Sequence, residues 1–135
     1  MLNLDTHILI HALDGSLTRS EAQLLQSDPD WGISAIVLWE IEMLYRRGRI
    51  RFGLDAPEFA KALAQIHVWP ISREVCLNLR RLDFHSDPAD ELIASTSLSH
   101  SVPLVTRDRK IRTTALSPES CTPNRNAYHP ASAGM

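Results

Sequence analysis

The sequence predicts an α/β fold in which a mainly parallel sheet is covered by helices on both faces, forming a three-layer α/β/α sandwich. Short apolar runs with strand character alternate along the chain with longer stretches whose apolar residues recur at helical spacing. This alternation indicates parallel strands, because each parallel pair needs a long crossover that is usually a helix. At 135 residues the chain is long enough for one domain with its own core.

The expected strands are short apolar runs that end in polar residues. The first follows directly from the opening M-L-N-L, the second is W-G-I-S, the third is V-W-P-I and the fourth is P-L-V-T. We expect these strands at 2–4, 31–34, 68–71 and 103–106.

Five of the six expected helices begin at a residue whose side chain typically caps a helix N-terminus. These residues are Thr18, Ser34, Asp55, Ser72 and Asp87. T-R-S-E and D-A-P-E also have the spacing of a capping box, and Gly48 is a plausible stop for the third helix. We expect helices at 6–13, 18–26, 34–47, 55–66, 72–81 and 87–100, with a short helical turn at 107–114.

The bulk properties exclude several classes of protein. With 44% hydrophobic and 22% charged residues and a net charge of −2, the chain has a globular composition without a general basic field. No apolar run approaches the roughly 20 residues of a membrane span, and the polar N-terminus is unlike a signal peptide. The two cysteines lack a C-x-x-C spacing, which favours free thiols in a reducing compartment. We therefore expect a cytoplasmic domain.

The composition changes after residue 116. Segment 117–135 contains three of the eight prolines and no Leu, Ile or Val. Such a segment cannot bury much apolar surface. We expect a folded domain at 1–116 and a disordered tail at 117–135.

Four acids occupy positions where a carboxylate needs an explanation. Asp5 and Asp108 follow the first and fourth strands, at the sheet edge where ligand sites of α/β proteins gather. Glu40 lies within the apolar stripe of its helix, and Asp90 shares a helix face with residues that should pack inward. Asp87 is explained as a helix N-cap followed by proline.

Taken singly, each of the four acids also has a purely structural interpretation as a turn, cap or edge residue. Their convergence favours a site, because several carboxylates near one edge raise one another's pKa unless a cation neutralises them. Oxygen ligands suit Mg²⁺ or Mn²⁺. His7 and His11 lack the glutamate of a zinc-binding H-E-x-x-H motif, so we interpret them as surface or hydrogen-bonded residues.

Four elements together resemble the PIN domain family, and more closely its VapC-type toxins of bacterial toxin–antitoxin pairs. They are L-D-T at 4–6, Glu40 within its apolar stripe, H-S-D-P-A-D-E-L-I-A-S at 85–95 and L-V-T-R-D at 104–108. L-D-T alone is a weak signal for the family, whereas the segment at 85–95 followed by the segment at 104–108 is a strong one. The resemblance covers about residues 1–113.

The resemblance implies a Mg²⁺- or Mn²⁺-dependent ribonuclease that cuts RNA, often tRNA or ribosomal RNA. It also implies a homodimer that a cognate VapB-type antitoxin silences. The catalytic quartet of the family falls on Asp5, Glu40, Asp90 and Asp108. Asp5, Asp90 and Asp108 are the expected metal ligands, and Glu40 either binds the metal or orients the attacking water. Hydrolysis at one or two metal ions would leave 5′-phosphate and 3′-hydroxyl ends.

Other residues have supporting parts. The resemblance gives Asp87 a supporting role beside the quartet, and Thr106 a role in orienting a ligand or substrate. Basic side chains beside the acids are candidates for RNA contacts, because Lys and Arg contacts to phosphates supply most non-specific affinity. These candidates are Arg107, Arg109, Arg46 and Arg47. For the last two, an equal alternative is a solvated helix end.

The C-terminal segment of the chain differs from the pattern of the family. Family members continue after the T-R-D segment into a last short strand, whereas segment 117–135 has no strand pattern. We therefore expect this edge strand to be missing.

Two other functions remain open. One is a catalytically weak PIN-fold module that acts by binding an antitoxin and, with it, operator DNA. The other is a different Mg²⁺-dependent phosphatase or nuclease, although aspartyl-phosphate phosphatases usually have D-x-D at the first strand, where this chain has D-T-H.

Overall fold

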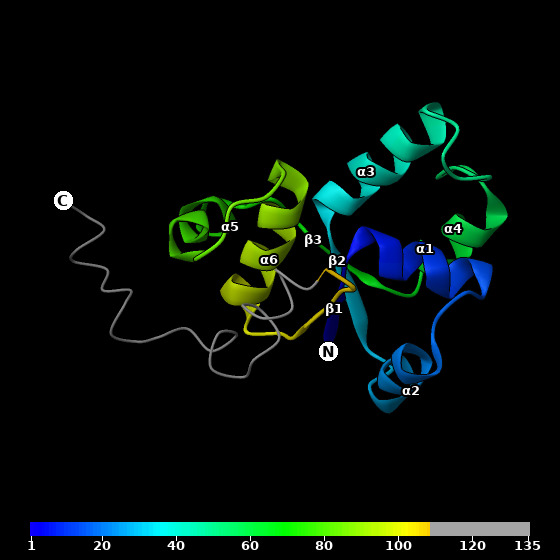
Figure 1. Cartoon of the computed structure of the whole chain (residues 1–135), viewed down its shortest axis with the longest axis horizontal. Coiled ribbons are helices and arrows are strands. Elements are labelled where there is room, and N and C mark those ends of the chain that lie inside the picture. Colours follow the sequence, from blue (N-terminus) through cyan, green and yellow to red (C-terminus); the bar gives the residue numbers. More distant parts are fainter. Residues whose placement is uncertain (109–135) are drawn as a thin grey trace.

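A computed structural model of the protein describes residues 1–108. Its four strands form one fully parallel sheet in the order β3-β2-β1-β4 (Figure 1). The strands are β1 (Leu2–Leu4), β2 (Trp31–Ser34), β3 (His67–Trp69) and β4 (Leu104–Val105). The α/β class and the parallel sheet are confirmed.

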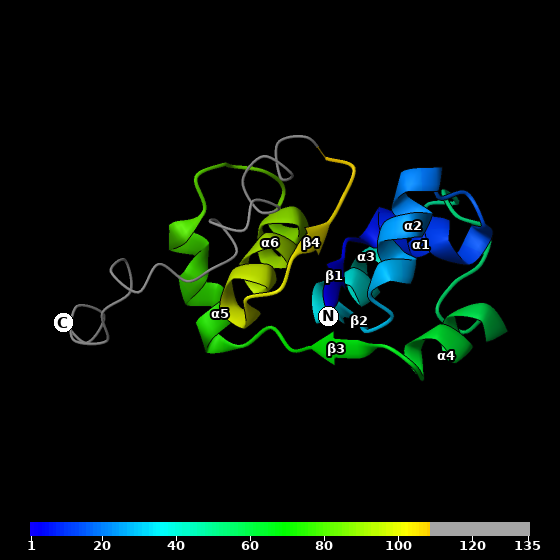
Figure 2. The same cartoon turned by 90° about the horizontal axis from the view of Figure 1, so that it is seen from below.

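Six α-helices and one 3₁₀ segment connect the strands. They are α1 (Thr6–Asp14), α2 (Arg19–Ser27), α3 (Ala35–Arg46), α4 (Pro57–Leu63), α5 (Arg73–Asn78), η1 (Leu79–Arg81) and α6 (Pro88–His100). Figures 1 and 2 show α5 and α6 on one side of the sheet and α1, α2 and α4 on the other. Helix α3 extends from the carboxyl end of β2 and contacts both α1 and α6. The three-layer sandwich predicted from the sequence is therefore present.

Most predicted caps are used as expected. Thr18 and Glu21 form the complete capping box of α2, and Ser34, Ser72 and Asp87 cap their helices through side-chain oxygens. These contacts satisfy amide groups that the first turn of a helix leaves without a partner. The local chemistry of these segments therefore agrees with the fold.

The predicted capping box at Asp55 is wrong. Helix α4 begins at Pro57, its N-cap is Ala56, and no side chain caps it. The amide of Ala56 is instead bound to the carbonyl of Gly53 in a turn that precedes the helix. The helix is also shorter than predicted and ends at Leu63.

Strand β3 begins and ends earlier than predicted. It occupies His67–Trp69, so Pro70 lies just outside it. Proline has no N–H to donate to a strand ladder, which explains why the strand ends here. In the same way β4 contains only two residues of the predicted four.

The core lies between the sheet and its helices and is largely aliphatic. Leu4, Ile8, Ile33 and Ile93 are fully or almost fully buried, so both faces of the sheet are covered. The part of the chain at 1–108 contains no helix with the length and apolar character that crossing a membrane requires.

Several predictions concern residues beyond this range. The domain boundary at 116, the tail at 117–135, the missing last strand and most of the turn at 107–114 lie outside the described residues. Cys76 is free and exposed, whereas Cys121 also lies outside them.

Candidate acidic site

The site is built around Asp5, which follows β1 at the carboxyl edge of the sheet. Its backbone N–H donates to the carbonyl of Val105, so pairing with β4 continues to this residue. Its carboxylate caps α1 by accepting the N–H of Ile8 at 2.9 Å. It also accepts the hydroxyl of Thr106, the residue after β4. Because β1 and β4 are parallel neighbours, the L-D-T and T-R-D segments meet here, as the strand order requires.

Asp90 reaches the site from the first turn of α6. The carboxylate of Asp87 accepts the N–H of Asp90 at 2.9 Å, which starts the helix at this point. The buried amide of Asn3 in β1 donates to the carbonyl of Ile93 at 3.1 Å and to Ser97 at 2.9 Å. This buried contact fixes α6 against β1, so Asp90 lies at the same edge of the sheet as Asp5.

Glu40 completes the group from α3. The preceding residues place it in the apolar stripe that contains Val37 and Ile41, both fully buried. Its carboxylate is half-buried and accepts the hydroxyl of Thr6, the residue that follows Asp5. Glu42, on the other side of the helix, is exposed as predicted.

The carboxylates influence one another electrostatically. Burial raises the pKa of Asp5 above its usual value, although the Thr106 hydroxyl opposes the shift. Burial also raises the pKa of Glu40, and the charges of Asp87 and Asp5 add to this effect. The charges of Asp5 and Asp87 therefore both act on Glu40.

Asp90 shows the largest effect of this environment. Its burial, together with the charges of Asp87 and Glu40, raises its pKa to about 6, and the hydroxyl of Ser86 only partly offsets this rise. Mutual repulsion of this kind is what a bound cation would relieve.

Asp108 is the last described residue and is exposed. Its backbone N–H donates to the hydroxyl of Thr106 at 3.1 Å, and the same hydroxyl donates to Asp5. Thr106 thus joins two of the four predicted acids. Within residues 1–108, no three His, Cys, Asp or Glu side chains are close enough together to hold a metal ion as they stand.

Hydroxyl groups hold the acids in place, and sequence reasoning assigned a part to only one of them. Thr106 was predicted to orient a ligand or substrate, whereas Thr6 and Ser86 were not singled out. Both lie inside the motifs L-D-T and H-S-D-P, but their partners are set by tertiary contacts. The buried Asn3 was missed as well, and its position in an apolar strand was the available signal.

The predicted RNA-binding arginines have different surroundings. Arg107 donates through Nε and Nη2 to the two carboxylate oxygens of Glu21, at 2.7 and 2.8 Å, and to the carbonyl of Ser16 at 3.2 Å. Arg46 ends α3 and Arg47 is its C-cap, and both are exposed. Arg109 lies outside the described residues.

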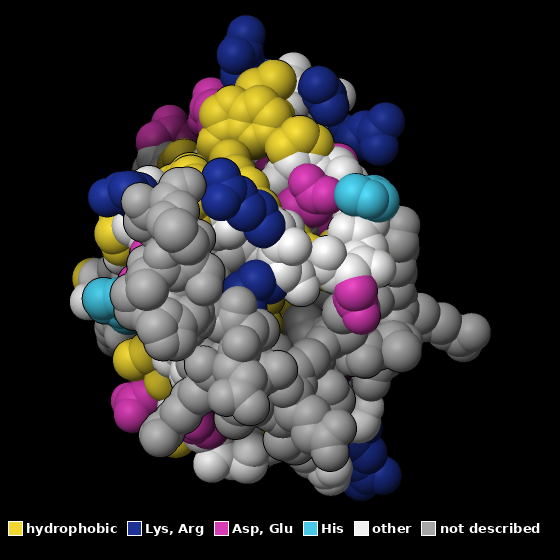
Figure 3. All heavy atoms as spheres, turned by 90° about the vertical axis from the view of Figure 1, so that its left-hand side faces the viewer, with side chains coloured by type: hydrophobic (Ala, Val, Ile, Leu, Met, Phe, Trp, Pro, Cys, Tyr) yellow, Lys and Arg dark blue, Asp and Glu magenta, His cyan; other side chains and the backbone are white. Residues whose placement is uncertain are grey.

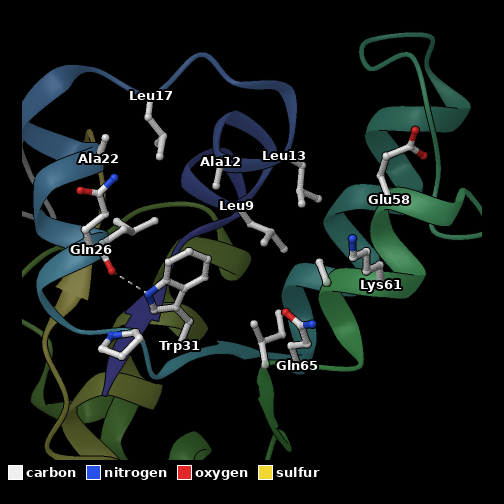
Figure 4. A pocket seen from close by; sticks show the side chains of 14 residues that line it. Leu9, Ala12, Leu13, Leu17, Ala22, Gln26, Trp31, Glu58, Lys61 and Gln65 are labelled. Carbon is white, nitrogen blue, oxygen red and sulfur yellow. Dashed lines mark hydrogen bonds between the residues drawn. The ribbon is translucent and has the colours of Figure 1, made fainter.

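Among the hollows of the described residues, two lie beside α1. The first, of about 770 Å³, is lined by arginine, histidine and aromatic side chains together with aliphatic ones and one acid, and we call it the basic groove. Its lining residues are His7, Ile10, His11, Asp14, Ser16, Leu44, Arg49, Ile50, Arg51 and Phe52. The second, of about 660 Å³, is mainly apolar and lies between α1, α2 and α4 (Figure 4). Leu9, Leu13, Leu17 and Trp31 line this apolar cleft.

The surface also exposes large apolar side chains. Trp39 and Tyr45 on α3 have 56% and 44% of their surface exposed. Figure 3 shows hydrophobic side chains gathered at the top of one face, with Lys and Arg side chains around them. Solvated hydrophobic surface of this kind is typical of contacts with other proteins.

Comparison with known proteins relates this arrangement to one family. The sequence model described as PIN domain matches residues 3–116. The chain is 28% identical over 114 residues to Ribonuclease VapC22 of Mycobacterium tuberculosis, which covers 81% of this chain and 88% of that protein.

Solved structures show the same fold at lower identity. A toxin–antitoxin complex from Klebsiella pneumoniae matches with a TM-score of 0.65 and 22% identity over 87% of this chain and 98% of that one. VapBC2 from Rickettsia felis, bound to a DNA fragment from its promoter, matches with a TM-score of 0.66 and 20% identity, over 87% and 95%. FitAcB from Neisseria gonorrhoeae matches with a TM-score of 0.61 and 20% identity, over 88% and 99%.

Proposed function

This chain belongs to the PIN domain family, and on that premise we propose that it is a Mg²⁺- or Mn²⁺-dependent endoribonuclease toxin of a toxin–antitoxin pair. It would hydrolyse RNA phosphodiester bonds and leave 5′-phosphate and 3′-hydroxyl ends. The observation that carries the proposal is that Asp5, Glu40 and Asp90 lie near the carboxyl edge of a parallel sheet and each has a raised pKa. Burial is the main cause in all three, and neighbouring carboxylates add to it for Glu40 and Asp90. The curated relative is named a ribonuclease.

The chemistry of the acids fits a hard cation. All donors are oxygens, and repulsion between the carboxylates raises the pKa of Glu40 and Asp90. Asp5, Asp90 and Asp108 would hold the ion, with Asp87 adding negative charge beside them. When bound, such an ion supplies Lewis-acid stabilisation of the phosphate and lowers the pKa of a coordinated water.

The side chains of the protein would then divide the remaining work. The Thr106 hydroxyl holds the Asp5 carboxylate in one orientation, and the Thr6 hydroxyl does the same for Glu40. Glu40 is half-buried with a raised pKa, which suits it to orient the attacking water or accept its proton. Direct metal binding by Glu40 is the alternative role.

We also propose two protein partners. The solved relatives include toxin–antitoxin complexes, which supports a VapB-type antitoxin as the cognate partner of this chain. The apolar cleft of Figure 4 offers such a partner a hydrophobic surface. The exposed Trp39 and Tyr45 support a homodimer formed through α3. A tRNA or ribosomal RNA substrate implies that the protein acts in the cytoplasm.

The test is cleavage of total cellular RNA by the purified protein with Mg²⁺, with Mn²⁺ and with EDTA. Asp5→Asn is the matched inactive variant, because Asn also caps helices well and should leave α1 intact. Asp30→Asn is the control, since this exposed acid precedes β2 at the opposite end of the sheet. We expect discrete metal-dependent fragments from the unmodified chain and from Asp30→Asn only.

The chemistry of the RNA ends separates the proposal from its rivals. Metal-ion hydrolysis predicts 5′-phosphate ends, whereas 2′,3′-cyclic phosphates would refute it. A folded protein that binds Mg²⁺ but leaves every RNA intact would favour the antitoxin-binding module. A phosphorylated protein intermediate would favour a phosphatase.

A further inference from the structure

We propose that the basic groove between α1 and segment 49–52 binds the single-stranded RNA that flanks the scissile phosphate. The inference rests on the proposed function, because it assigns substrate contacts to the surface next to the acidic site. The groove is large, at about 770 Å³, and is formed by residues from three separate segments of the chain.

The charge of the groove suits a polyanion. Arg49 and Arg51 line one wall, are exposed, and form no ion pair within residues 1–108. Asp14 is the acid that lines the groove, and its carboxylate accepts both the N–H and the hydroxyl of Ser16. Two guanidinium groups are therefore available for phosphate contacts.

Planar side chains favour RNA over an acidic peptide. His7, His11 and Phe52 line the same groove as the arginines. The ring of Phe52 packs against Phe59 with centroids 5.3 Å apart, which fixes its position. Unpaired bases stack on aromatic and imidazole rings, whereas an acidic peptide would use the charges alone.

The groove begins at the acidic site. His7 lines the groove and follows Asp5 by only two positions in the chain. Leu44, on the groove wall, follows Glu40 by one turn of α3. The helical rise separates Asp5 and His11 by about 9 Å along the axis of α1. An RNA strand bound at the acids can therefore continue into the groove.

The structure divides the arginines of the sequence Y-R-R-G-R-I-R-F into two sets. Arg49 and Arg51 line the groove, whereas Arg46 and Arg47 lie at the end of α3 and do not. The proposal therefore assigns RNA contacts to Arg49 and Arg51, whereas the contacts of Arg46 and Arg47 stay a prediction.

The experiment measures binding separately from cleavage. The probe is a 12-nucleotide single-stranded RNA of mixed sequence with a 5′-fluorescein, and anisotropy is recorded in EDTA at several KCl concentrations. Arg49→Gln with Arg51→Gln should lower the affinity about tenfold or more and reduce the salt slope by about 1.4, which corresponds to two phosphate contacts. Arg73→Gln with Arg80→Gln, two exposed arginines on the α5 side, is the charge-matched control and should leave the slope unchanged.

Three results would overturn the proposal. The groove variant and the control could lose affinity equally, which would indicate diffuse attraction. Arg46→Gln with Arg47→Gln could cause the loss in place of the groove variant. The groove variant could also keep its affinity for RNA but lose affinity for poly-glutamate, which would assign the groove to an acidic protein segment.

A second measurement uses the unmodified chain and does not depend on the folding of any variant. An RNA that contains 4-thiouridine, crosslinked and analysed by mass spectrometry, should label peptides with Phe52 or His7. Labels confined to other surfaces would refute the groove. If the unmodified chain binds through the groove but cleaves nothing with Mg²⁺, the groove stands and the nuclease proposal fails. If the groove variant cleaves RNA as fast as the unmodified chain, the nuclease proposal stands and the groove proposal fails.

Discussion

Replacing Asp90 by Asn is expected to stabilise the metal-free protein while it abolishes RNA cleavage. The Asp90 carboxylate is half-buried beside the charges of Asp87 and Glu40, and its pKa is raised to about 6. At neutral pH the carboxylate is ionised in both states. In the folded state its burial and the neighbouring charges make the ionised form unfavourable, whereas in the unfolded chain water surrounds it. The amide oxygen of Asn can still accept the Ser86 hydroxyl, so the substitution mainly removes a charge.

The magnitude follows from the pKa difference. A rise from 3.8 to about 6 corresponds, at about 1.4 kcal/mol per pH unit, to about 3 kcal/mol at neutral pH. Partial contact of the carboxylate with water reduces this, so we expect the free energy of unfolding to increase by about 1–2 kcal/mol in the variant. Between pH 4 and 6 the unfolded chain has lost the proton and the folded chain retains it. The advantage of the variant therefore grows as the pH rises through this window and vanishes below it.

Urea denaturation in EDTA at pH 4 and at pH 7.5 measures the effect, with Asp30→Asn as the control. Cleavage with Mg²⁺ should fall by roughly 100-fold or more in Asp90→Asn, as when a group that stabilises transition-state charge is removed. Equal stability of the variant and the unmodified chain at pH 7.5 would contradict the raised pKa of Asp90. A difference in stability that is the same at both pH values would contradict it as well.

Further predictions concern the ion pair of Arg107, the packing at Gly32 and the binding of Mg²⁺. Arg107→Met or Glu21→Gln should lower the rate of cleavage about tenfold or more with little change in melting temperature. The ion pair holds the segment between Thr106 and Asp108, and a reaction slows when its reacting groups are displaced. Equal kcat values for the variants and the unmodified chain would contradict this. The pKa of Glu21 is depressed to about 2, so this pair should persist as the pH falls and be lost only from about pH 4.5 towards 2. Gly32→Ala should destabilise the protein by about 1–3 kcal/mol in urea titrations, since a Cβ at this position would lie 2.5 Å from the buried Trp69 ring. Mg²⁺ at ten times its dissociation constant should stabilise the unmodified chain by about 1.4 kcal/mol in a thermal melt, and an equal shift in Asp5→Asn would argue against the acids as ligands.

Much of the fold could be predicted because its determinants are local. The cap at Ser34 and the box of Thr18 with Glu21 depend on a few neighbouring residues, and the structure contains both. The sequence D-A-P-E at Asp55 has the same pattern but is not used, because a turn from Gly53 to Ala56 takes its place. A capping pattern alone does not reveal which competing turn is more stable.

The acids of the candidate site could be singled out from the sequence, and their role in catalysis stays a prediction. Asp5, Glu40 and Asp90 stand out because each is a charge at a position that should be buried or at a strand end. The hydroxyl of Thr6 that holds Glu40 comes from 34 residues away, and the glutamate that binds Arg107 from 86 residues away. Contacts across such separations leave no periodic signal in the sequence, so Arg107 was assigned to phosphate alone.

The contact between Thr106 and Asp5 has a consequence for biosynthesis. It joins residues 101 positions apart, and it depends on β4, a two-residue strand that pairs with β1 near the end of the described chain. A ribosome that adds about 5–20 residues per second delivers Thr106 roughly 5–20 s after Asp5. Nascent chains that stop before this strand contain Asp5, Glu40 and Asp90 but lack the threonine that orients the first of them. The Thr106 contact that orients Asp5 can therefore form only after residue 106 has been synthesised, 101 positions after Asp5.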